Sequence, residues 1–307
     1  MRNSFANAFY EIAKDDPRIY LIAADIGAAA GVLTFIQEYP DRFLNVGVAE
    51  AIMIGMAAGM AMRGKIPFAY TIAPFTIYRP FEQVRDDCCY QDQPVRHIAV
   101  GRALNYPLLG ATHNATEDIA LMCALPNMTV LAPCDPAETR EVTLATRQID
   151  GPLYLGMGKA GEPDLTANAE PFRLGKIRKL RHGSDLAILT YGPIAKMALD
   201  VADRLQKEKG KSTAVYSVHC IKPLDKEGIL GVLNGFPEVV VFEEHSPFGG
   251  LGPQVKELAW DAGISGKTRL KTYSLQDRFA HAYGSYYEVL AAHGLTPERM
   301  FEEWAKL

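Results

Sequence analysis

Short apolar, β-rich runs alternate with longer stretches of helical character over most of the chain. We expect the apolar runs to form strands, because strands of a parallel sheet are buried on both faces. This alternation predicts an α/β fold in which helices cover both faces of mostly parallel sheets. The expected strands span residues 19–25, 66–71, 97–101, 128–133, 152–156, 186–192, 213–218, 238–244 and 269–274. The expected helices span residues 4–14, 49–63, 117–124, 136–146, 194–207 and 251–262, with a short helix near 225–233 and others near the C-terminus.

The composition changes once along the chain. Residues 159–185 are polar, carry Pro and Gly and are basic in the middle, which is typical of a linker with room for a short strand. The alternation resumes after this segment. We therefore predict one domain at residues 1–165, a linker at residues 166–185 and a second domain at residues 186–307. A length of 307 residues fits two domains at about 150 residues each.

Composition, charge and cysteine content narrow the class of protein. A chain that is 48% hydrophobic and 22% charged is typical of a globular protein, and its formal net charge of -4 argues against a nucleic-acid-binding surface. The five cysteines show no metal-ligand spacing, so we expect free thiols in a reducing compartment and a cytoplasmic protein. Residues 1–17 contain acids and no continuous apolar run, so we expect no signal peptide.

A single carboxylate stands in a long apolar stretch, because Glu50 is the only charged residue from Leu44 to Met62. The stretch approaches the ~20 residues of a membrane span, but Glu50 and the many glycines and alanines favour a buried helix in an α/β protein. Glu50 falls in the expected first turn of this helix, where the helix dipole stabilises an anion. It serves there either as a helix-terminal charge or as a functional group.

Four motifs resemble those of the transketolase family, in the same order. They are "AAD" ending at Asp25, "PDRFLNVGVAEAIMIGMAAGMA" around Glu50, the aromatic segment "FTIYRPFEQVRDD", and "LLGATHNATEDIALMCALPNMTVLAPCDPAE" around His113. They cover about residues 1–160, and "VVVFEEHSPFGGLG" gives the second domain a looser likeness to the family's C-terminal domain. The resemblance implies a pyrimidine-binding domain, thiamine diphosphate as cofactor, and transfer of a two-carbon ketol unit from a ketose to an aldehyde in carbohydrate metabolism.

The resemblance gives three polar residues a role. Glu50 matches the glutamate that hydrogen-bonds the aminopyrimidine ring of the cofactor. Few polar neighbours would favour the protonated form of this carboxyl group, which could then share its proton with a ring nitrogen. His113 matches a substrate-side histidine that hydrogen-bonds a hydroxyl or carbonyl oxygen of the donor, and histidine suits proton exchange near neutral pH. Asp25 matches a residue on the thiazolium side, although a cap after the first strand explains it nearly as well.

The aromatic segment carries Phe75, Tyr78 and Phe81 at three-residue intervals. This spacing places the three rings on one broad face of a helix, which suits core packing as well as a binding pocket. By resemblance they match the aromatic pocket that stacks on the pyrimidine ring. Because Pro80 is tolerated only in the first turn of a helix, we expect Phe75 just before the helix and Tyr78 at its start.

The family's diphosphate-binding motif, G-D-G followed by a pair of Asn residues, does not occur in the sequence. Magnesium takes oxygen ligands and shares them with phosphates, and the sequence shows no such ligand set. The resemblance therefore implies the C-terminal subunit of a split transketolase, whose partner chain holds the diphosphate and Mg²⁺. Two copies of each chain would form a two-fold symmetric α2β2 heterotetramer, and this chain is expected to be inactive alone.

The expected substrate side departs from the family pattern. The chain keeps Arg2, but it has Lys159 where the family has arginine and Gly101 or Arg102 where the family has histidine. Lysine cannot make the bidentate phosphate contact of arginine. We therefore predict a specialised sugar or sugar-like substrate, contacted by Arg2, Arg102, His113 and Lys159. The alternatives are a deoxyxylulose-phosphate synthase, the beta chain of a 2-oxo acid dehydrogenase, and a non-catalytic scaffold with the same fold.

Overall fold

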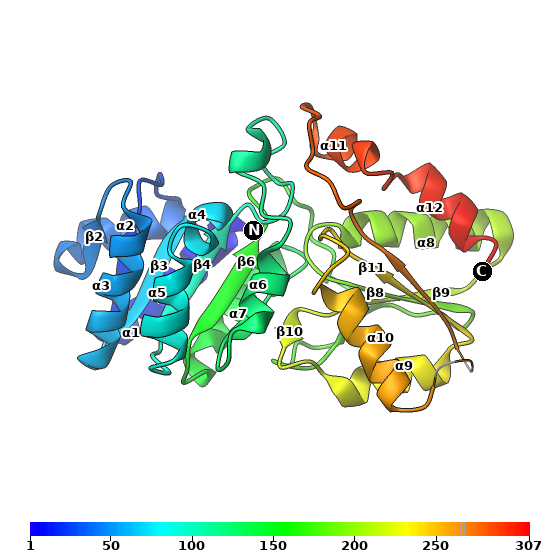
Figure 1. The fold of residues 1–307 in the computed structure, drawn as a ribbon, viewed down its shortest axis with the longest axis horizontal. Coiled ribbons are helices and arrows are strands. Elements are labelled where there is room, and N and C mark those ends of the chain that lie inside the picture. The colour runs from blue at the N-terminus through cyan, green and yellow to red at the C-terminus, as the bar shows by residue number, and fades with distance from the viewer. Residues whose placement is uncertain (265, 267) are drawn as a thin grey trace.

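The computed structural model describes residues 1–264, 266 and 268–307, which form two sheets (Figure 1). One has seven strands in the order β10-β5-β6-β4-β3-β1-β2, and the other has five in the order β12-β11-β8-β9-β7. All neighbouring strands are parallel except the antiparallel pairs β10–β5 and β7–β9. The predicted α/β fold with two mostly parallel sheets is confirmed. The strands are β1 Ile19–Ala23, β2 Phe43–Asn45, β3 Ile66–Ile72, β4 Arg96–Val100, β5 Thr129–Leu131, β6 Leu153–Met157, β7 Arg178–Arg181, β8 Leu186–Thr190, β9 Thr213–Ser217, β10 Cys220–Lys222, β11 Glu238–Phe242 and β12 Arg269–Tyr273.

Helices cover both faces of the first sheet, as the buried strands require. On one face, α1, α2 and α7 bury Phe5, Phe35 and Val142. On the other face, α3 and α6 bury Met53 and Ile119. The helices of this part are α1 Arg2–Asp15, α2 Ala30–Glu38, η1 Pro40–Arg42, α3 Glu50–Met62, α4 Ala73–Ile77, α5 Phe81–Gln83, the π-helix η2 Val84–Cys89, η3 Gly110–Thr112, α6 Asp118–Ala124, α7 Pro136–Ala145 and η4 Thr146–Gln148.

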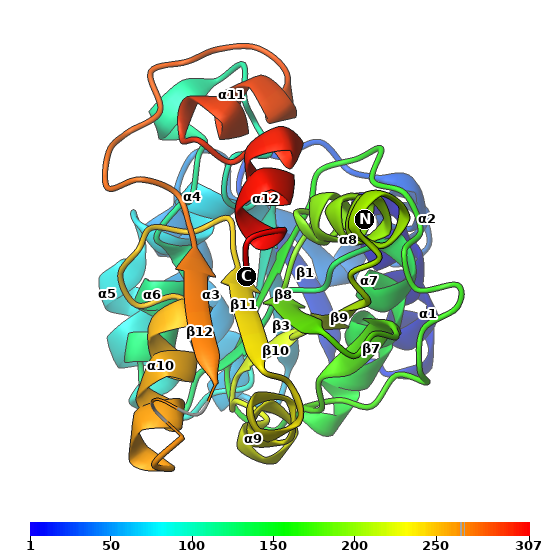
Figure 2. The ribbon, with the colours of Figure 1, turned by 90° about the vertical axis from the view of Figure 1, so that its right-hand side faces the viewer.

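The second sheet is sandwiched in the same way (Figure 2). Helices α8 and α12 bury Val201 and Trp304 against one face. Helices α9 and α10 bury Ile229 and Val255 against the other. The helices of this part are α8 Ala195–Lys209, α9 Lys226–Gly235, α10 Leu251–Asp261, α11 Tyr286–Ala292 and α12 Pro297–Trp304.

The two sheets are joined by more than the connecting segment. The sequence pattern did not predict β10, which follows β9 of the second sheet but pairs with β5 of the first, with Cys220 opposite Leu131. The N–H of Ala132 donates to the carbonyl of His219 at 2.8 Å and extends this contact. Strand β7, within the segment predicted as a linker, forms an edge of the second sheet.

Within the described ranges, no helix combines the length and the apolar character needed to cross a membrane. The apolar stretch that holds Glu50 forms the 13-residue helix α3, preceded by the short strand β2.

Candidate functional site

The residues singled out from the sequence gather because they follow strands that end at one edge of the first sheet. In a sheet of parallel strands, the carboxyl ends lie together and form the usual place for a ligand. Asp25 follows β1, Glu50 follows β2 and Phe75 follows β3. The segment with His113 follows β4, and Lys159 follows β6. Since β6, β4, β3, β1 and β2 are consecutive neighbours in the sheet, distant parts of the sequence meet at this edge.

Glu50 is the first residue of α3, and only 5% of its surface is exposed. One carboxylate oxygen, Oε1, accepts a hydrogen bond from Nη1 of Arg79 at 2.7 Å. The expectation that Glu50 has few polar neighbours is therefore wrong, because a guanidinium lies against it. The carboxyl group of Glu50 therefore lies between the N-terminus of α3 and the guanidinium of Arg79.

The aromatic segment spans three short helical pieces, α4, α5 and the start of η2, rather than one helix. Helix α4 has Pro74 in its first turn, and Pro80 is the N-cap of α5. The expectation that a helix begins at Tyr78 is wrong, because Pro74 provides the helix start and Phe75 lies inside the first helix. The ring of Phe75 lies under Arg79, whose guanidinium carbon is 4.4 Å from the ring centroid.

Tyr78 and Phe81 end up in different surroundings. The hydroxyl of Tyr78 donates to Oε2 of Glu117 at 2.6 Å, and burial together with this acceptor raises the pKa of the phenol. Tyr78 and Glu117 also line a cavity of about 410 Å³, together with Leu104. Phe81 is half-buried against the hydrophobic core. The three rings therefore do not share one contact surface.

His113 lies against Phe75, with ring centroids 5.2 Å apart in an edge-to-face arrangement. Its Nδ1 is 2.9 Å from the hydroxyl of Thr112. Burial lowers the pKa of His113, and the positive charge of Arg79 lowers it further. His113 is therefore neutral at neutral pH, so its ring offers both a hydrogen-bond donor and an acceptor.

Tyr106 lies between His113 and Lys159, one of the expected substrate-binding cations. The ring of Tyr106 lies 5.9 Å from that of His113, and Nζ of Lys159 lies 4.7 Å from the Tyr106 centroid. Arg2 donates from Nε to the hydroxyl of Tyr70 at 2.6 Å and also to the carbonyl of Gly27. Lys159 is exposed and Arg2 is half-buried, so both cations remain accessible to a ligand at this edge.

Asp25 lies just beyond β1 and is exposed, with a positive φ of 43°. Its N–H donates to Oδ1 of Asn45 at 3.2 Å, which ties the end of β1 to the end of β2. The backbone contact fits a role in shaping the edge of the sheet, while its carboxylate is free to face a ligand.

Arg102 does not fit the substrate-contacting role predicted for it. Its side chain is fully buried, and it donates two hydrogen bonds to Asp118, from Nε at 2.9 Å and from Nη2 at 2.8 Å. Tyr154 donates to the same carboxylate at 2.9 Å, and the ring of Tyr191 lies 5.0 Å from the guanidinium carbon. Arg102 is a buried structural cation, and a ligand cannot reach it without unpacking the two domains.

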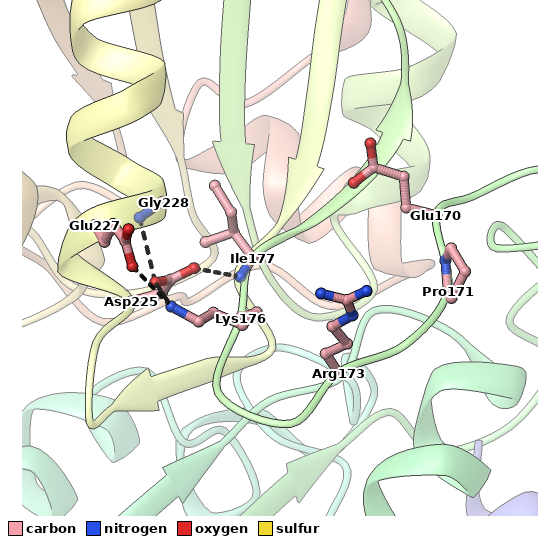
Figure 3. Close-up of a pocket in the computed structure, with 8 residues that line it drawn as sticks. All are labelled: Glu170, Pro171, Arg173, Lys176, Ile177, Asp225, Glu227 and Gly228. Atoms are coloured by element: carbon pink, nitrogen blue, oxygen red, sulfur yellow. Dashed lines mark hydrogen bonds and ion pairs between the residues drawn. The ribbon is translucent and has the colours of Figure 1, made fainter.

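Among the residues the structure describes, no cluster of three or more His, Cys, Asp or Glu side chains is arranged to hold a metal ion. A separate hollow of about 520 Å³ lies away from these residues (Figure 3). There Lys176 pairs with Asp225 at 3.0 Å, and Asp225 also accepts from the N–H of Ile177 and of Gly228. These contacts fix the start of α9 beside the segment leading to β7 and include none of the predicted site residues.

Two residues of the site were missed from the sequence. Arg79 carries no signal of its own in the sequence, although its place four residues after Phe75 allows the two side chains to touch. Tyr106 is placed by Gly101, whose φ of 69° and missing side chain leave room for the Tyr106 ring. A glycine just after a buried strand was the available signal.

Comparison with known protein families shows which family the chain belongs to. Residues 1–160 match the family model "Transketolase, pyrimidine binding domain". The chain belongs to the transketolase family. Residues 175–300 match the model "Transketolase, C-terminal domain". The resemblance drawn from the motifs around Glu50 and His113 is confirmed.

Members of the transketolase family resemble this chain over nearly its whole length. A subunit of the apulose-4-phosphate transketolase of Phocaeicola vulgatus is 32% identical over 298 residues, which cover 97% of this chain and 94% of that protein. A solved structure described as "Split gene transketolase, inactive beta4 tetramer" superposes with a TM-score of 0.86 at 32% identity and covers 99% of this chain and 96% of that one. Thus the chain is similar to subunits of transketolases divided between chains.

The chain is also similar to enzymes of a second kind, the deoxyxylulose-phosphate synthases. The 1-deoxy-D-xylulose-5-phosphate synthase of Natranaerobius thermophilus is 31% identical over 301 residues, which cover 97% of this chain and 47% of that protein. Both kinds of relative belong to the thiamine-dependent enzymes, so the comparisons alone leave the synthase alternative open.

Proposed function

We propose that this chain is the subunit of a two-chain, thiamine-diphosphate-dependent transketolase that binds the pyrimidine half of the cofactor and one side of the substrate. The complete enzyme transfers a two-carbon ketol unit from a ketose to an aldehyde. The observation that carries the proposal is the cluster of Glu50, Arg79, Phe75 and His113 at the carboxyl ends of the parallel strands. A scaffold without a catalytic role gives no reason for a nearly buried carboxylate, an arginine, an aromatic ring and a histidine in successive contact.

The chemistry of this cluster fits one end of the cofactor and not the other. Glu50 can bond a ring nitrogen, and Phe75 offers an aromatic face for a flat heterocycle. The sequence lacks the G-D-G motif and the Asn pair with which the family holds a magnesium diphosphate. We therefore place the Mg²⁺ and diphosphate on a partner chain with a G-D-G motif and an Asn pair, within an α2β2 heterotetramer. When bound, thiamine diphosphate supplies the nucleophile for breaking and making the carbon–carbon bond.

The remaining residues act on the substrate in this proposal. His113 is neutral and donates or accepts a hydrogen bond at a hydroxyl or carbonyl oxygen of the donor sugar. Tyr78 and Glu117 line a cavity beside this cluster, and Asp25, just beyond β1, would lie on the thiazolium side of the cofactor. Arg2 and Lys159 supply positive charge where the acceptor binds. Arg102 plays no direct part, because its guanidinium is buried.

Reconstitution tests the two-chain proposal. This chain alone, with thiamine diphosphate and Mg²⁺, is expected to show no ketol transfer, because its sequence lacks the G-D-G motif and the Asn pair of the family. Mixed with a partner chain that carries the G-D-G motif, it is expected to form a complex of two copies of each and to become active, as measured by light scattering and a coupled assay. Ketol transfer by this chain alone would contradict the proposal that two different chains are needed for activity.

The substrate class is tested on the same complex. Because Lys159 stands where a bidentate arginine is usual, we expect slow turnover with xylulose phosphate as donor and ribose phosphate as acceptor. Steady-state kinetics with a panel of phosphorylated and unphosphorylated aldehydes would identify better acceptors. Brisk turnover of the two pentose phosphates would refute the specialised substrate. If the complex instead transferred a two-carbon unit from pyruvate to glyceraldehyde phosphate with release of CO2, the synthase alternative would replace ketol transfer.

A further inference from the structure

His113 is carried by a loop whose base is closed. Residues 104–114, called here the His113 loop, lie between Ala103 and Ala115, which form an antiparallel bridge with N–H to carbonyl distances of 3.1 and 2.9 Å. The bridge fixes where the loop starts and ends. It does not fix how the loop is oriented over the edge of the sheet, so other contacts must set the direction in which His113 points.

A buried carboxylate of the second domain supplies one such contact. Glu244 follows β11 and has no exposed surface. Its Oε1 accepts from the N–H of Leu104, the first residue of the His113 loop, at 2.8 Å. Its Oε2 accepts from the hydroxyl of Tyr286 at 2.7 Å, at the start of α11. One side chain therefore joins the base of the His113 loop to the C-terminal segment.

The two residues after Glu244 hold the other side of the loop. Nε2 of His245 accepts from the N–H of Ala120 at 3.2 Å, and the N–H of Ser246 donates to the carbonyl of Thr116 at 2.8 Å. Nδ1 of His245 lies 2.8 Å from the carbonyl of Ser246, which fits a neutral ring that donates from Nδ1. Glu244, His245 and Ser246 of the second domain thus form hydrogen bonds to the chain on both sides of His113.

The C-terminal segment also touches the loop from above. Gly110 has a φ of 70°, and a side-chain carbon at this position would lie 3.1 Å from the hydroxyl of Tyr283, so the Tyr283 side chain lies directly against the loop. Figure 1 shows the segment before α11 rising beside this part of the first domain. The loop is enclosed by the second domain on two sides.

We propose that the second domain positions His113, with Glu244 as the positioning residue that ties the His113 loop to Tyr286. The expected effect of this contact on catalysis rests on the role of His113 proposed above. The expected effect on the order of the His113 loop does not. Glu244 touches no expected substrate atom and acts through the backbone of Leu104. The second domain then helps to orient a residue of the candidate site, in addition to its part in folding.

Matched tyrosine variants of the full chain test this proposal. Tyr286→Phe removes the hydroxyl that bonds Glu244, while Tyr191→Phe removes a hydroxyl that bonds the adjacent Glu243 at 2.9 Å and does not contact the loop. We expect Tyr286→Phe to speed amide hydrogen exchange in residues 104–114 by about three- to tenfold, the usual effect of one lost hydrogen bond. Tyr191→Phe should leave that exchange unchanged.

Glu244→Gln provides a second arm with a pH readout. Burial raises the pKa of Glu244 to about 7, against the opposing effect of Arg102 and with a smaller contribution from Asp118, and Tyr286 is the other titratable group that faces it. Raising the pH from 4.5 to above 7 therefore destabilises the wild-type fold through this carboxyl group. Relative to wild type, the Tm of Glu244→Gln should rise over that interval. An unchanged Tm difference would contradict the raised pKa of Glu244, whereas the exchange comparison tests its positioning role.

The exchange result decides the proposal independently of turnover. Equal exchange in Tyr286→Phe and wild type, or equal acceleration in Tyr191→Phe, would overturn it. In the reconstituted enzyme, Tyr286→Phe should lower kcat/KM with an unchanged amount of complex. Absence of ketol transfer in the wild-type complex would instead count against the proposed function and leave the exchange comparison intact.

Discussion

Replacing Glu50 with Gln is expected to lower the turnover of the reconstituted enzyme by about 10²- to 10⁴-fold, the usual contribution of a positioned acid–base group. The substitution keeps the size of a nearly buried side chain and its hydrogen bond to Arg79, because the amide oxygen can still accept. It removes the carboxyl group that can share a proton with a ring nitrogen. The chain should therefore fold, assemble with its partner and remain almost inactive.

Calorimetric titration with thiamine diphosphate and Mg²⁺ separates binding from chemistry in this variant. The matched control is Glu302→Gln, which removes an exposed carboxylate on α12 and should leave turnover unchanged. Near-normal turnover of Glu50→Gln with the cofactor bound would sink the assignment. A variant that no longer assembles would need the milder Glu50→Asp to separate structure from chemistry.

Replacing Arg102 with Met is expected to cost about 3–5 kcal/mol in the free energy of unfolding, because it leaves the buried carboxylate of Asp118 without its cation. Tyr154 supplies a remaining hydrogen bond to that carboxylate but no charge. The measurement is the shift of the denaturation midpoint in urea. Arg299→Met is the control, because Arg299 pairs with Glu303 at the surface and should contribute no more than about 1 kcal/mol.

The double variant Arg102→Met with Asp118→Asn is expected to recover much of this loss, because it removes the unpaired buried charge. This pattern separates a structural role from the substrate contact expected from the sequence. If Arg102→Met kept its stability and raised only KM for the acceptor, Arg102 would be a binding residue after all.

The fold was largely predictable because buried parallel strands leave continuous apolar runs in the sequence. Strands β4, β6, β8 and β9 are buried along their whole length, and each was expected. The three-residue strand β2 was missed because two of its three residues are exposed and it is too short for a pattern to show. Strand β10 was missed because its pairing partner β5 lies in the other domain, and local sequence does not encode such a pairing.

The site was predictable where one residue carries its own signal. Glu50 stood out as a lone charge, and His113 and Phe75 stood out through the motifs around them. Arg79 was invisible because its partner Glu50 lies 29 residues earlier along the chain. Arg102 was misread for a related reason. An arginine in a sequence has the character of a surface cation until its buried partner Asp118 is known.

The pairing of β10 with β5 has a consequence for dividing this chain. A fragment that ended within the segment 166–185 would leave one edge of β5 with unpaired N–H and C=O groups, and such edges recruit strands from other molecules. A fragment that began there would carry β10 with nothing to pair against. The sequence pattern distinguishes the two domains. Each nevertheless needs a strand of the other, because β5 of the first pairs with β10 of the second. A gene division at this point would therefore leave β5 and β10 each without a pairing partner and prone to pair with other molecules. This favours keeping both domains on one polypeptide.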